Sequence, residues 1–181
     1  SGGRLLFNPG EAGLAAAAVA TEPERPTRGP QLPGVVHDGN AFAIGGVSGN
    51  AGLFGDLEAV AAFARAWLDG TLADRLGIDP ALLERLFADV RPGTDNLARS
   101  SAGWLANAAR RQQPALSGSA FGHTGFTGTS IWIDLPAGRA YVVLTNAVAK
   151  SGYSNGGMSN PEYRRRLTAW RRELHGALAA I

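Results

Sequence analysis

The 181-residue sequence contains no cysteine and only one lysine, Lys150. Without cysteine, disulfide bonds, thiol catalysis and thiolate-bound zinc are all excluded. The three histidines, His37, His123 and His175, are too dispersed along the chain to indicate a metal site. We therefore expect neither a metal ion nor another cofactor.

Long apolar runs and a large net charge are also absent. The longest apolar run, residues 14–20, is mostly alanine and falls well short of the roughly 18 residues that a membrane helix needs. The formal net charge of +2 gives no electrostatic footprint for nucleic acid. Because 45% of the residues are apolar, intrinsic disorder is excluded as well. We expect a folded domain with no membrane span and no nucleic-acid partner.

The remaining composition divides the sequence into three regions. Prolines and glycines interrupt almost every helical pattern in residues 1–36, which predicts an irregular excursion over a core built by other residues. Residues 37–95 are predicted to be a helical region, and residues 100–181 a sheet followed by a terminal helix. Within the helical region, residues 40–55 are rich in glycine and small apolar side chains, which predicts a tightly packed, buried loop.

Two helices in the middle region are marked by capping residues. Asp56 can accept the free amides of a first helical turn, and Gly70 ends the helical apolar spacing that follows it. Asp79 is the predicted cap of a second helix, with Pro80 at its first position. Both helices carry their apolar residues on one face, which predicts that each packs against a core.

A third helix is predicted to begin at about Pro161. Its apolar residues follow the spacing 4, 3, 4, 4, 3 and should form one packing face: Tyr163, Leu167, Trp170, Leu174, Leu178 and Ile181. Arginines 164–166 and 171–172 lie around this stripe, which favours a solvated outer face over a nucleic-acid patch. His175 lies beside the stripe and is interpreted as a surface or packing residue.

Alternating side chains indicate a sheet in the last third of the chain. Ile131 and Ile133 alternate with polar or aromatic neighbours, as expected for a strand with two different faces. A Pro-Ala-Gly turn at residues 136–138 separates this strand from a β-branched partner. Strands are expected around residues 101–106, 121–126, 129–135 and 140–146. The predicted class is α+β, an antiparallel sheet with flanking helices.

The string FGHTGFTGTS at residues 121–130 combines His123 and Thr124 with three glycines. Glycine weakens a strand, and it often marks a place where a ligand or another backbone comes close. The string has two interpretations. It is either a glycine-rich bulge with a solvated histidine, or a site that offers an imidazole, a hydroxyl and a backbone amide to an anion or carbonyl.

A family resemblance favours the second interpretation. GHTGFTGTSIWID followed by YVVLTN is similar to the third motif of the serine β-lactamase and penicillin-binding-protein family, a K-T-G or H-T-G triad on an edge strand. The string VHDGNAFAIGGVSGNAGLFGDLEAVAAFARAWLDG at residues 36–70 resembles the class C-like, esterase-like branch. Asn50 departs from the histidine that many relatives have there. The resemblance implies a β-lactamase/transpeptidase-like fold, with residues 1–181 as the C-terminal portion of one catalytic domain.

The family nucleophile, a serine in S-x-x-K, has no counterpart in this sequence. The residue three positions before Lys150 is Ala147. In the family this motif lies upstream of the matched strings, so we expect the N-terminal half of the same domain to be a partner. The second motif, Y-x-N or S-x-N, is matched literally at residues 153–155 and 48–50, but the first match follows the H-T-G and the second lies in the glycine-rich loop.

The resemblance also implies roles for four residues. In the intact enzyme the missing serine would attack the carbonyl of a small ester, amide or lactam, and water would hydrolyse the acyl-enzyme. His123 and Thr124 would orient the polar end of the substrate or assist proton movement, and Gly125 completes the triad. The backbone N–H of Phe126 would be one of two oxyanion donors. The chain alone is expected to be inactive.

Two other functions stay open from the sequence. The chain could be a non-catalytic interaction module or truncated remnant of the family. An exposed apolar surface would support this alternative. It could also be an independent hydrolase with a rearranged site near His123 and Tyr153.

Overall fold

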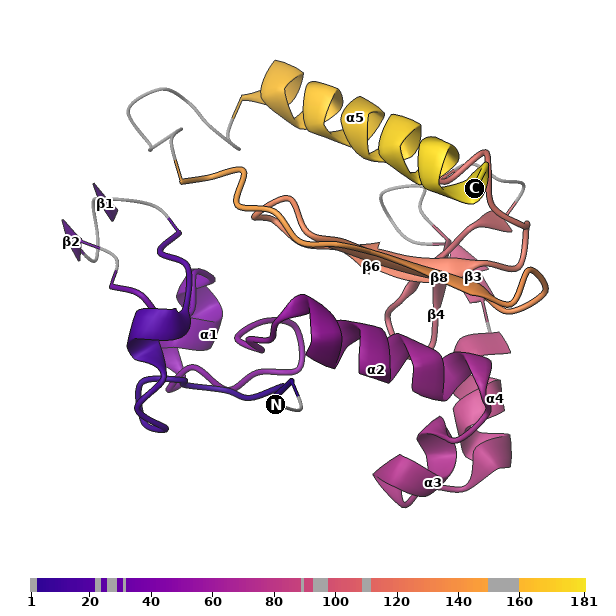
Figure 1. Cartoon of the computed structure of the whole chain (residues 1–181), viewed down its shortest axis with the longest axis horizontal. Coiled ribbons are helices and arrows are strands. Elements are labelled where there is room, and N and C mark those ends of the chain that lie inside the picture. The colour runs from indigo at the N-terminus through magenta and orange to yellow at the C-terminus, as the bar shows by residue number, and fades with distance from the viewer. Residues whose placement is uncertain are drawn as a thin grey trace. The chain divides into compact units, whose positions relative to one another are not determined.

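The computed structural model describes residues 3–21, 24–25, 29–30, 32–88, 90–92, 98–108, 112–149 and 160–181 (Figure 1). The chain forms two compact units, which are described one at a time. The first contains Ser1–Val60, Phe126–Gly128 and Leu144–Arg165. The second contains Ala61–Gly125, Thr129–Val143 and Arg166–Ile181.

The second unit is built on an antiparallel sheet. In chain order its described strands are β3 (Val90–Pro92), β4 (Ala98–Ser100), β5 (Leu105–Ala106), β6 (Phe121–Thr124), β7 (Ser130–Asp134) and β8 (Arg139–Val143). They lie side by side in that same order, each antiparallel to the next. The predicted α+β class is confirmed. The last three strands and the turn before Arg139 lie where the alternation and the Pro-Ala-Gly signal placed them.

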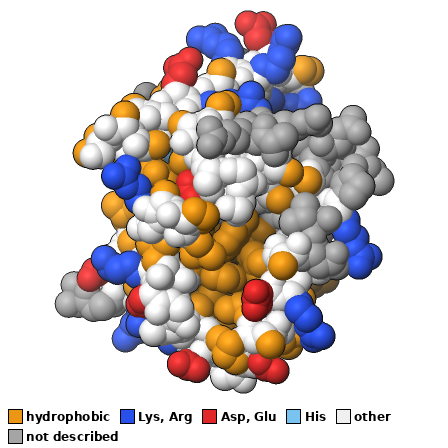
Figure 2. Space-filling view, turned by 90° about the vertical axis from the view of Figure 1, so that its right-hand side faces the viewer, with side chains coloured by type: hydrophobic (Ala, Val, Ile, Leu, Met, Phe, Trp, Pro, Cys, Tyr) orange, Lys and Arg blue, Asp and Glu red, His pale blue; other side chains and the backbone are white. Residues whose placement is uncertain are grey.

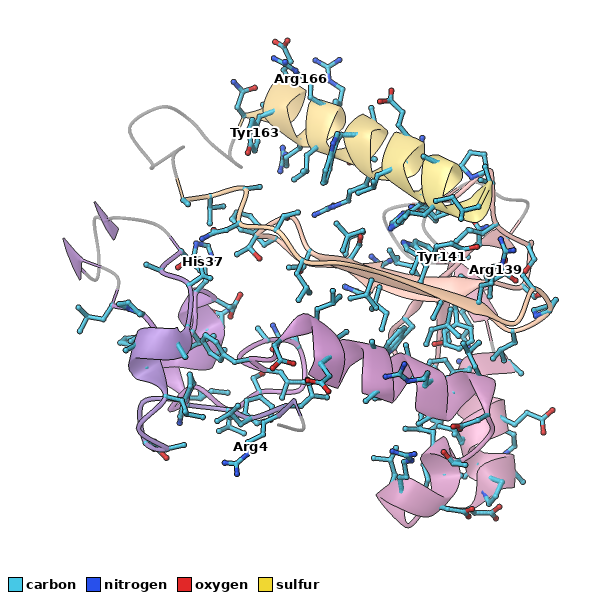
Figure 3. All side chains as sticks on the ribbon, in the orientation of Figure 1. Arg4, His37, Arg139, Tyr141, Tyr163 and Arg166 are labelled. Atoms are coloured by element: carbon cyan, nitrogen blue, oxygen red, sulfur yellow. The ribbon has the colours of Figure 1, made fainter. Side chains whose placement is uncertain are left out.

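One face of this sheet packs against α5 (Pro161–Ala179). The core on that side joins residues from three strands, a loop and the end of the helix: Leu105, Leu116, Ala120, Trp132, Tyr141 and Ala179. Trp132 is fully buried, and a Cβ on Gly122 in the adjacent strand would overlap its indole ring. Figure 3 shows Tyr141 and Arg139 of β8 on the α5 side, where the Arg139 Nη1 donates to the Ala179 carbonyl at 3.0 Å.

The other face carries a cluster of aromatic rings. Trp67 of α2 (Leu57–Leu68) makes edge-to-face contacts with Phe87 of α4 (Pro80–Ala88) and with Phe121 of β6, at centroid distances of 4.4 and 5.0 Å. Trp104 packs against Phe87 and Phe121 as well. Such pairs contribute about 0.5–1.5 kcal/mol each beyond the burial of their area. These ring contacts anchor the start of β6 to α2 and α4.

The helix caps are as predicted. The Asp56 carboxylate accepts from the Ala59 N–H, and the Asp79 carboxylate from the Ala81 N–H, both at 2.8 Å. In the sequence a short helix, α3 (Leu72–Leu76), follows α2 and precedes α4. It ends at Gly77, which has the left-handed conformation with φ 64°.

The first unit contains shorter elements. They are a 3-10 turn, η1 (Ala15–Ala17), a two-stranded ribbon of β1 (Glu24–Arg25) and β2 (Gly29–Pro30), and α1 (Gly39–Ala43). Asp38 caps α1 by accepting from the Ala41 N–H at 2.8 Å. A backbone bridge between Leu6 and Phe54 ties the N-terminal segment to the loop that precedes α2.

The prediction of a buried loop at residues 40–55 is wrong. The exposed fractions of Phe42, Ile44, Val47 and Leu53 are 46%, 67%, 53% and 55%. Three of the glycines, at positions 45, 46 and 52, serve turns with positive φ angles of 85° to 102°. Close packing is limited to two of them, because a Cβ at position 46 would overlap the Asn8 side chain and one at position 52 the carbonyl of residue 46. This part of the chain therefore presents apolar side chains to its surroundings.

The predicted packing face of the last helix is wrong in half of its residues, whereas Tyr163, Leu167 and Leu174 are half-buried. Trp170, Leu178 and Ile181 are exposed by 42%, 37% and 91%, whereas the buried residues of α5 are Arg171 and His175. Arginines 164–166 and 172 are exposed, so the solvated face was predicted correctly for them and incorrectly for Arg171. Arg171 and His175 can be buried because both have hydrogen-bond partners at the end of the sheet. Within the described ranges, no helix has the length and apolarity needed to cross a bilayer.

Asn107 organises the loop between β5 and β6 and provides a test of the fold. Its side chain is fully buried, donates to the carbonyls of Gln113 (2.8 Å) and Ser117 (2.9 Å), and accepts from the Gln113 N–H (2.8 Å). Asn107→Leu keeps the branched arrangement of side-chain heavy atoms but leaves these buried groups unpaired, so we expect the free energy of unfolding to fall by about 2–4 kcal/mol. Urea denaturation followed by tryptophan fluorescence measures it. The exposed Asn40→Ala is the control, and an equal effect of both changes would contradict the role of Asn107.

Candidate functional site

The H-T-G string lies at the C-terminal end of β6. The edge position that the resemblance implied is wrong, because β6 lies between β5 and β7 in the sheet. However, β5 pairs only with Phe121 and Gly122. Beyond Gly122, among the described strands, only β7 is paired with β6, through His123–Ile131 and Thr124–Ser130. The strand is internal at its start and resembles an edge at its end.

His123 and Thr124 lie on opposite faces of this strand, since successive side chains alternate. The His123 side chain is exposed, and its Nδ1 lies 3.0 Å from the Thr124 carbonyl oxygen. The tautomer that carries its proton on Nδ1 donates this bond and leaves Nε2 as an acceptor. Thr124 is half-buried beside Ser130. The imidazole is thus the more accessible of the two groups.

Gly125 closes the turn between β6 and β7. Its N–H donates to the Thr129 carbonyl at 2.8 Å, and a Cβ at this position would collide with the Thr129 hydroxyl. On that side of the Gly125 backbone the Thr129 side chain fills the space and leaves no room for a ligand. The close approach that requires glycine here lies within the chain.

Phe126 begins the segment of this turn that belongs to the first unit. Its side chain is 51% exposed, and its ring stacks on the imidazole of His37 at a centroid distance of 5.4 Å. The same segment is held by a second connection, because the Thr127 carbonyl accepts from the Ala147 N–H at 2.6 Å. In the sequence His37 is only one of three dispersed histidines, so this contact between residues far apart in the chain was not predicted.

Two buried residues of α5 contact the same end of the sheet. Sequence reasoning missed Arg171 and left His175 open between a surface and a packing residue, of which the structure shows the second. Arg171 is 6% exposed, and its Nη2 donates to the Gly125 carbonyl at 2.7 Å. His175, one turn later, is fully buried, with Nε2 3.2 Å from the Ser130 hydroxyl and its ring in edge contact with Tyr141. The only sequence signal is their i, i+4 spacing with Leu167, and apolar periodicity does not register polar residues.

Burial controls the ionisation of both groups. Burial, and then the positive charge of Arg171, lower the pKa of His175 from 6.5 to about 4. Burial also lowers the pKa of Arg171. At neutral pH the imidazole is therefore neutral beside a charged guanidinium, and the two side chains do not repel each other.

The Ser130–His175 pair is not a catalytic dyad. A nucleophile and its base must be reachable by substrate, whereas these residues are 4% and 0% exposed. In the described part of the chain, His175 Nδ1 has no hydrogen-bond partner, so no third group orients the ring as a base. The pair is a structural contact between α5 and β7.

The structure describes only some of the other candidate residues. Lys150 and the Y-x-N match at residues 153–155 lie outside the described residues. In the S-x-N match the Ser48 hydroxyl donates to the Asn50 side chain on an exposed loop. The described ranges contain no cluster of three or more histidine or acidic side chains that could hold a metal ion.

The contact between Gly125 and Thr129 gives one prediction. The φ angle of Gly125 is not positive, so alanine is excluded here only by the Thr129 side chain. Gly125→Ala should lower the free energy of unfolding by about 1–3 kcal/mol through overpacking. Thr129→Ala removes the colliding hydroxyl, and the double variant should recover most of the loss. Urea denaturation of the four proteins measures the coupling, and strictly additive effects would exclude the collision.

The lowered pKa of His175 gives a second prediction, for stability against pH. In the unfolded chain the imidazole binds a proton near pH 6.5, but in the folded protein only near pH 4. Stability is therefore complete above about pH 6.5 and is lost as the pH falls toward 4, by at most about 3 kcal/mol.

The groups that face the His175 imidazole are Arg171, Ser130 and Tyr141. His175→Gln should flatten the stability profile between pH 4 and 6.5, while the exposed His123→Gln should leave the profile unchanged. Urea midpoints across this range measure it. A His175→Gln protein that keeps the full slope would show that another group titrates.

Comparison with known proteins supplies the context of this site. The family model described as Beta-lactamase matches residues 6–156. Proteins named "Putative D-alanyl-D-alanine carboxypeptidase" from Salmonella agona (strain SL483) and Escherichia coli O157:H7 are each 33% identical to this chain over 118 residues. The match covers 62% of this chain and 27% and 26% of those two proteins, so the chain spans about a quarter of each.

No solved structure is significantly similar to the chain. The family model, in contrast, covers most of the sequence and includes both the glycine-rich loop and the H-T-G strand. The antiparallel sheet with α5 on one face agrees with the fold that the H-T-G string implied. The chain belongs to the Beta-lactamase family, which includes the penicillin-binding proteins, as the resemblance predicted.

Proposed function

We propose that this chain supplies the H-T-G strand and one oxyanion donor of a serine hydrolase that acts on esters, amides or lactams through an acyl-enzyme. The observation that carries the proposal is the end of β6. There an exposed imidazole lies on a strand whose backbone is unpaired beyond Gly122 on the β5 side, among the described strands. In a member of the Beta-lactamase family this strand end is the place for a substrate.

The chemistry follows from the groups at this strand end. A serine hydroxyl attacks the carbonyl carbon of the substrate, and the carbonyl oxygen becomes an oxyanion. The Phe126 N–H and the amide of the nucleophile itself donate to that oxygen, and losing one donor costs roughly 3 kcal/mol of transition-state stabilisation. The leaving group departs with a proton, and water then hydrolyses the ester bond to the serine.

His123 acts at the polar end of the substrate or at the leaving group. Its exposed ring can accept a hydrogen bond or transfer a proton through Nε2, and general acid–base catalysis of this kind contributes about 10²–10⁴-fold. Thr124 supports the strand from the opposite face beside Ser130. Gly125 serves the turn that presents the next peptide N–H.

The nucleophile and its base come from outside residues 1–181 in this proposal. A serine hydroxyl is a weak nucleophile unless a base is held beside it, and the only lysine, Lys150, follows Ala147 instead of a serine at the required offset. We infer that the N-terminal half of the same domain supplies S-x-x-K and that residues 1–181 are the C-terminal portion of that domain.

Exposed apolar side chains support a partner of that kind. Five large hydrophobic residues between positions 42 and 57 are exposed by 46% to 67%: Phe42, Ile44, Val47, Leu53 and Leu57. Figure 2 shows another face of the molecule, on which hydrophobic side chains also gather near the centre and many of the charged ones lie toward its edge. Apolar surface of this kind marks interaction sites. The same observation also favours the second candidate, a non-catalytic interaction module.

Activity measurements separate the candidates. Residues 1–181 alone should not hydrolyse a chromogenic cephalosporin, a p-nitrophenyl ester or a peptide ending in D-alanyl-D-alanine above the buffer rate, and a fluorophosphonate should leave their intact mass unchanged. The peptide is included because the relatives are named for it. A single stoichiometric adduct with ester hydrolysis would place the nucleophile within this chain and favour the rearranged site.

A longer chain that includes the upstream S-x-x-K should turn over at least one of these substrates. In it, His123→Ala should lower kcat by about 100-fold, whereas the exposed Arg165→Ala should leave kcat unchanged. If the longer chain carries the motif, folds and is still inactive toward every substrate class, the interaction module replaces the hydrolase.

A further inference from the structure

We propose that Arg171 is a positioning residue for the oxyanion donor, because it fixes the peptide group whose N–H belongs to Phe126. The inference deepens the proposed function and rests on it for the role of that N–H. Nothing in the family resemblance or in the apolar pattern of α5 singles out Arg171. The inference comes from the hydrogen bond between its guanidinium and the Gly125 carbonyl.

The geometry of a peptide bond connects Arg171 to the donor. The Gly125 carbonyl and the Phe126 N–H belong to one planar peptide group, and among the described residues no peptide bond is cis. In a trans peptide the C=O and N–H point in opposite directions. When Arg171 Nη2 holds the Gly125 oxygen at 2.7 Å, the Phe126 N–H is directed away from α5.

The preceding peptide group is held as well. The Gly125 N–H donates to the Thr129 carbonyl at 2.8 Å, so both polar groups of Gly125 have a partner. This matters because glycine has no side chain that could limit its backbone, and the turn also contains Gly128 at φ 101°. Without an external hydrogen bond, the peptide between Gly125 and Phe126 could rotate. Arg171 provides that bond from the helix.

The charge of Arg171 adds to the effect of its position. A hydrogen bond from a cation is stronger than a neutral one, and the guanidinium is only 6% exposed, where electrostatic interactions are weakly screened. A cation at the carbonyl oxygen polarises the amide, so the Phe126 N–H becomes a better donor to a developing negative charge. Arg171 therefore acts through the peptide and does not itself contact the substrate.

The helix that carries Arg171 is fixed along its length. His175 contacts the Ser130 hydroxyl one turn further on, and the Ala179 carbonyl accepts from Arg139 near the end of α5. The neighbouring Arg172 is exposed and donates from Nε to the Gln112 carbonyl at 3.0 Å. Arg172 provides a matched control, because it has the same side chain, lies on the same helix turn and also donates to a backbone carbonyl.

The first experiment needs no catalysis. In the unaltered protein, NMR should detect a coupling across the hydrogen bond between the Arg171 side-chain nitrogen and the Gly125 carbonyl carbon. Arg171→Met should shift and broaden the Phe126 amide signal, because the peptide between Gly125 and Phe126 is then no longer held in one orientation, and Arg171→Lys should restore part of the native shift. Arg172→Met should leave the Phe126 signal unchanged. The absence of the coupling, or an unchanged Phe126 amide in Arg171→Met, would overturn the inference even if a variant failed to fold.

The second experiment uses the longer chain with its S-x-x-K. Arg171→Met should lower kcat for a p-nitrophenyl ester about 10- to 100-fold with little change in KM, because a misdirected donor affects the transition state more than substrate binding. Arg171→Lys should recover part of kcat, and affinity for a boronic acid that forms a tetrahedral adduct should fall with kcat/KM. A rise in KM without a fall in kcat, or an equal fall in kcat in Arg172→Met, would show that the role of Arg171 is merely structural. If the unaltered longer chain is inactive, the proposed function fails while the NMR result still decides the position of Arg171.

Discussion

A buried cation with a backbone acceptor holds the candidate site together. Taking a guanidinium out of water is costly, and the cost is offset only where the charge finds good acceptors. Arg171 meets this condition at the Gly125 carbonyl, which lies at the end of β6, where the ladder to β5 has already ended. Helix, strand end and turn therefore depend on one another. Without the helix the Gly125 carbonyl would lose a charged donor, and without the turn the guanidinium would lose that acceptor.

The neutral state of His175 is part of the same arrangement. A second cation one turn from Arg171 would be repelled at this buried position. The pKa of the His175 imidazole is lowered to about 4 by burial and by that charge. Ser130 is compatible with either tautomer, since a hydroxyl can donate or accept. The contact between α5 and β7 thus tolerates one fixed charge and one uncharged polar group. An apolar stripe would have been simpler, but it could not have provided a donor to the turn.

The elements that could be predicted from the sequence are those fixed by local chemistry. The alternation around Ile131 and Ile133 placed β7, and the carboxylates of Asp56 and Asp79 marked the starts of α2 and α4. The H-T-G string identified the family, but the strand that carries His123 is internal in the sheet and not the edge strand that the resemblance implied. What escaped prediction depends on partners distant in sequence. Arg171 bonds a carbonyl 46 positions away, and His37 stacks on Phe126 across an even longer interval. An arginine in a helix is assigned to solvent by default, and no pattern of spacing shows that a carbonyl lies opposite it.

Different contacts hold the two ends of β6, which explains how the candidate site can be rigid and open at once. Phe121, at the start, is held among Trp67, Phe87 and Trp104, and packing of this density resists displacement. The far end is held by Arg171 and by the turn to Thr129. Between them lie His123 and Thr124, whose backbone is paired on one side only among the described strands, because β5 comprises only Leu105 and Ala106. Unpaired backbone groups must be satisfied by water or by a ligand. Since both ends of the strand are fixed, a ligand bound there as we propose would not have to order the strand, and the interactions that it makes would be available for binding and catalysis.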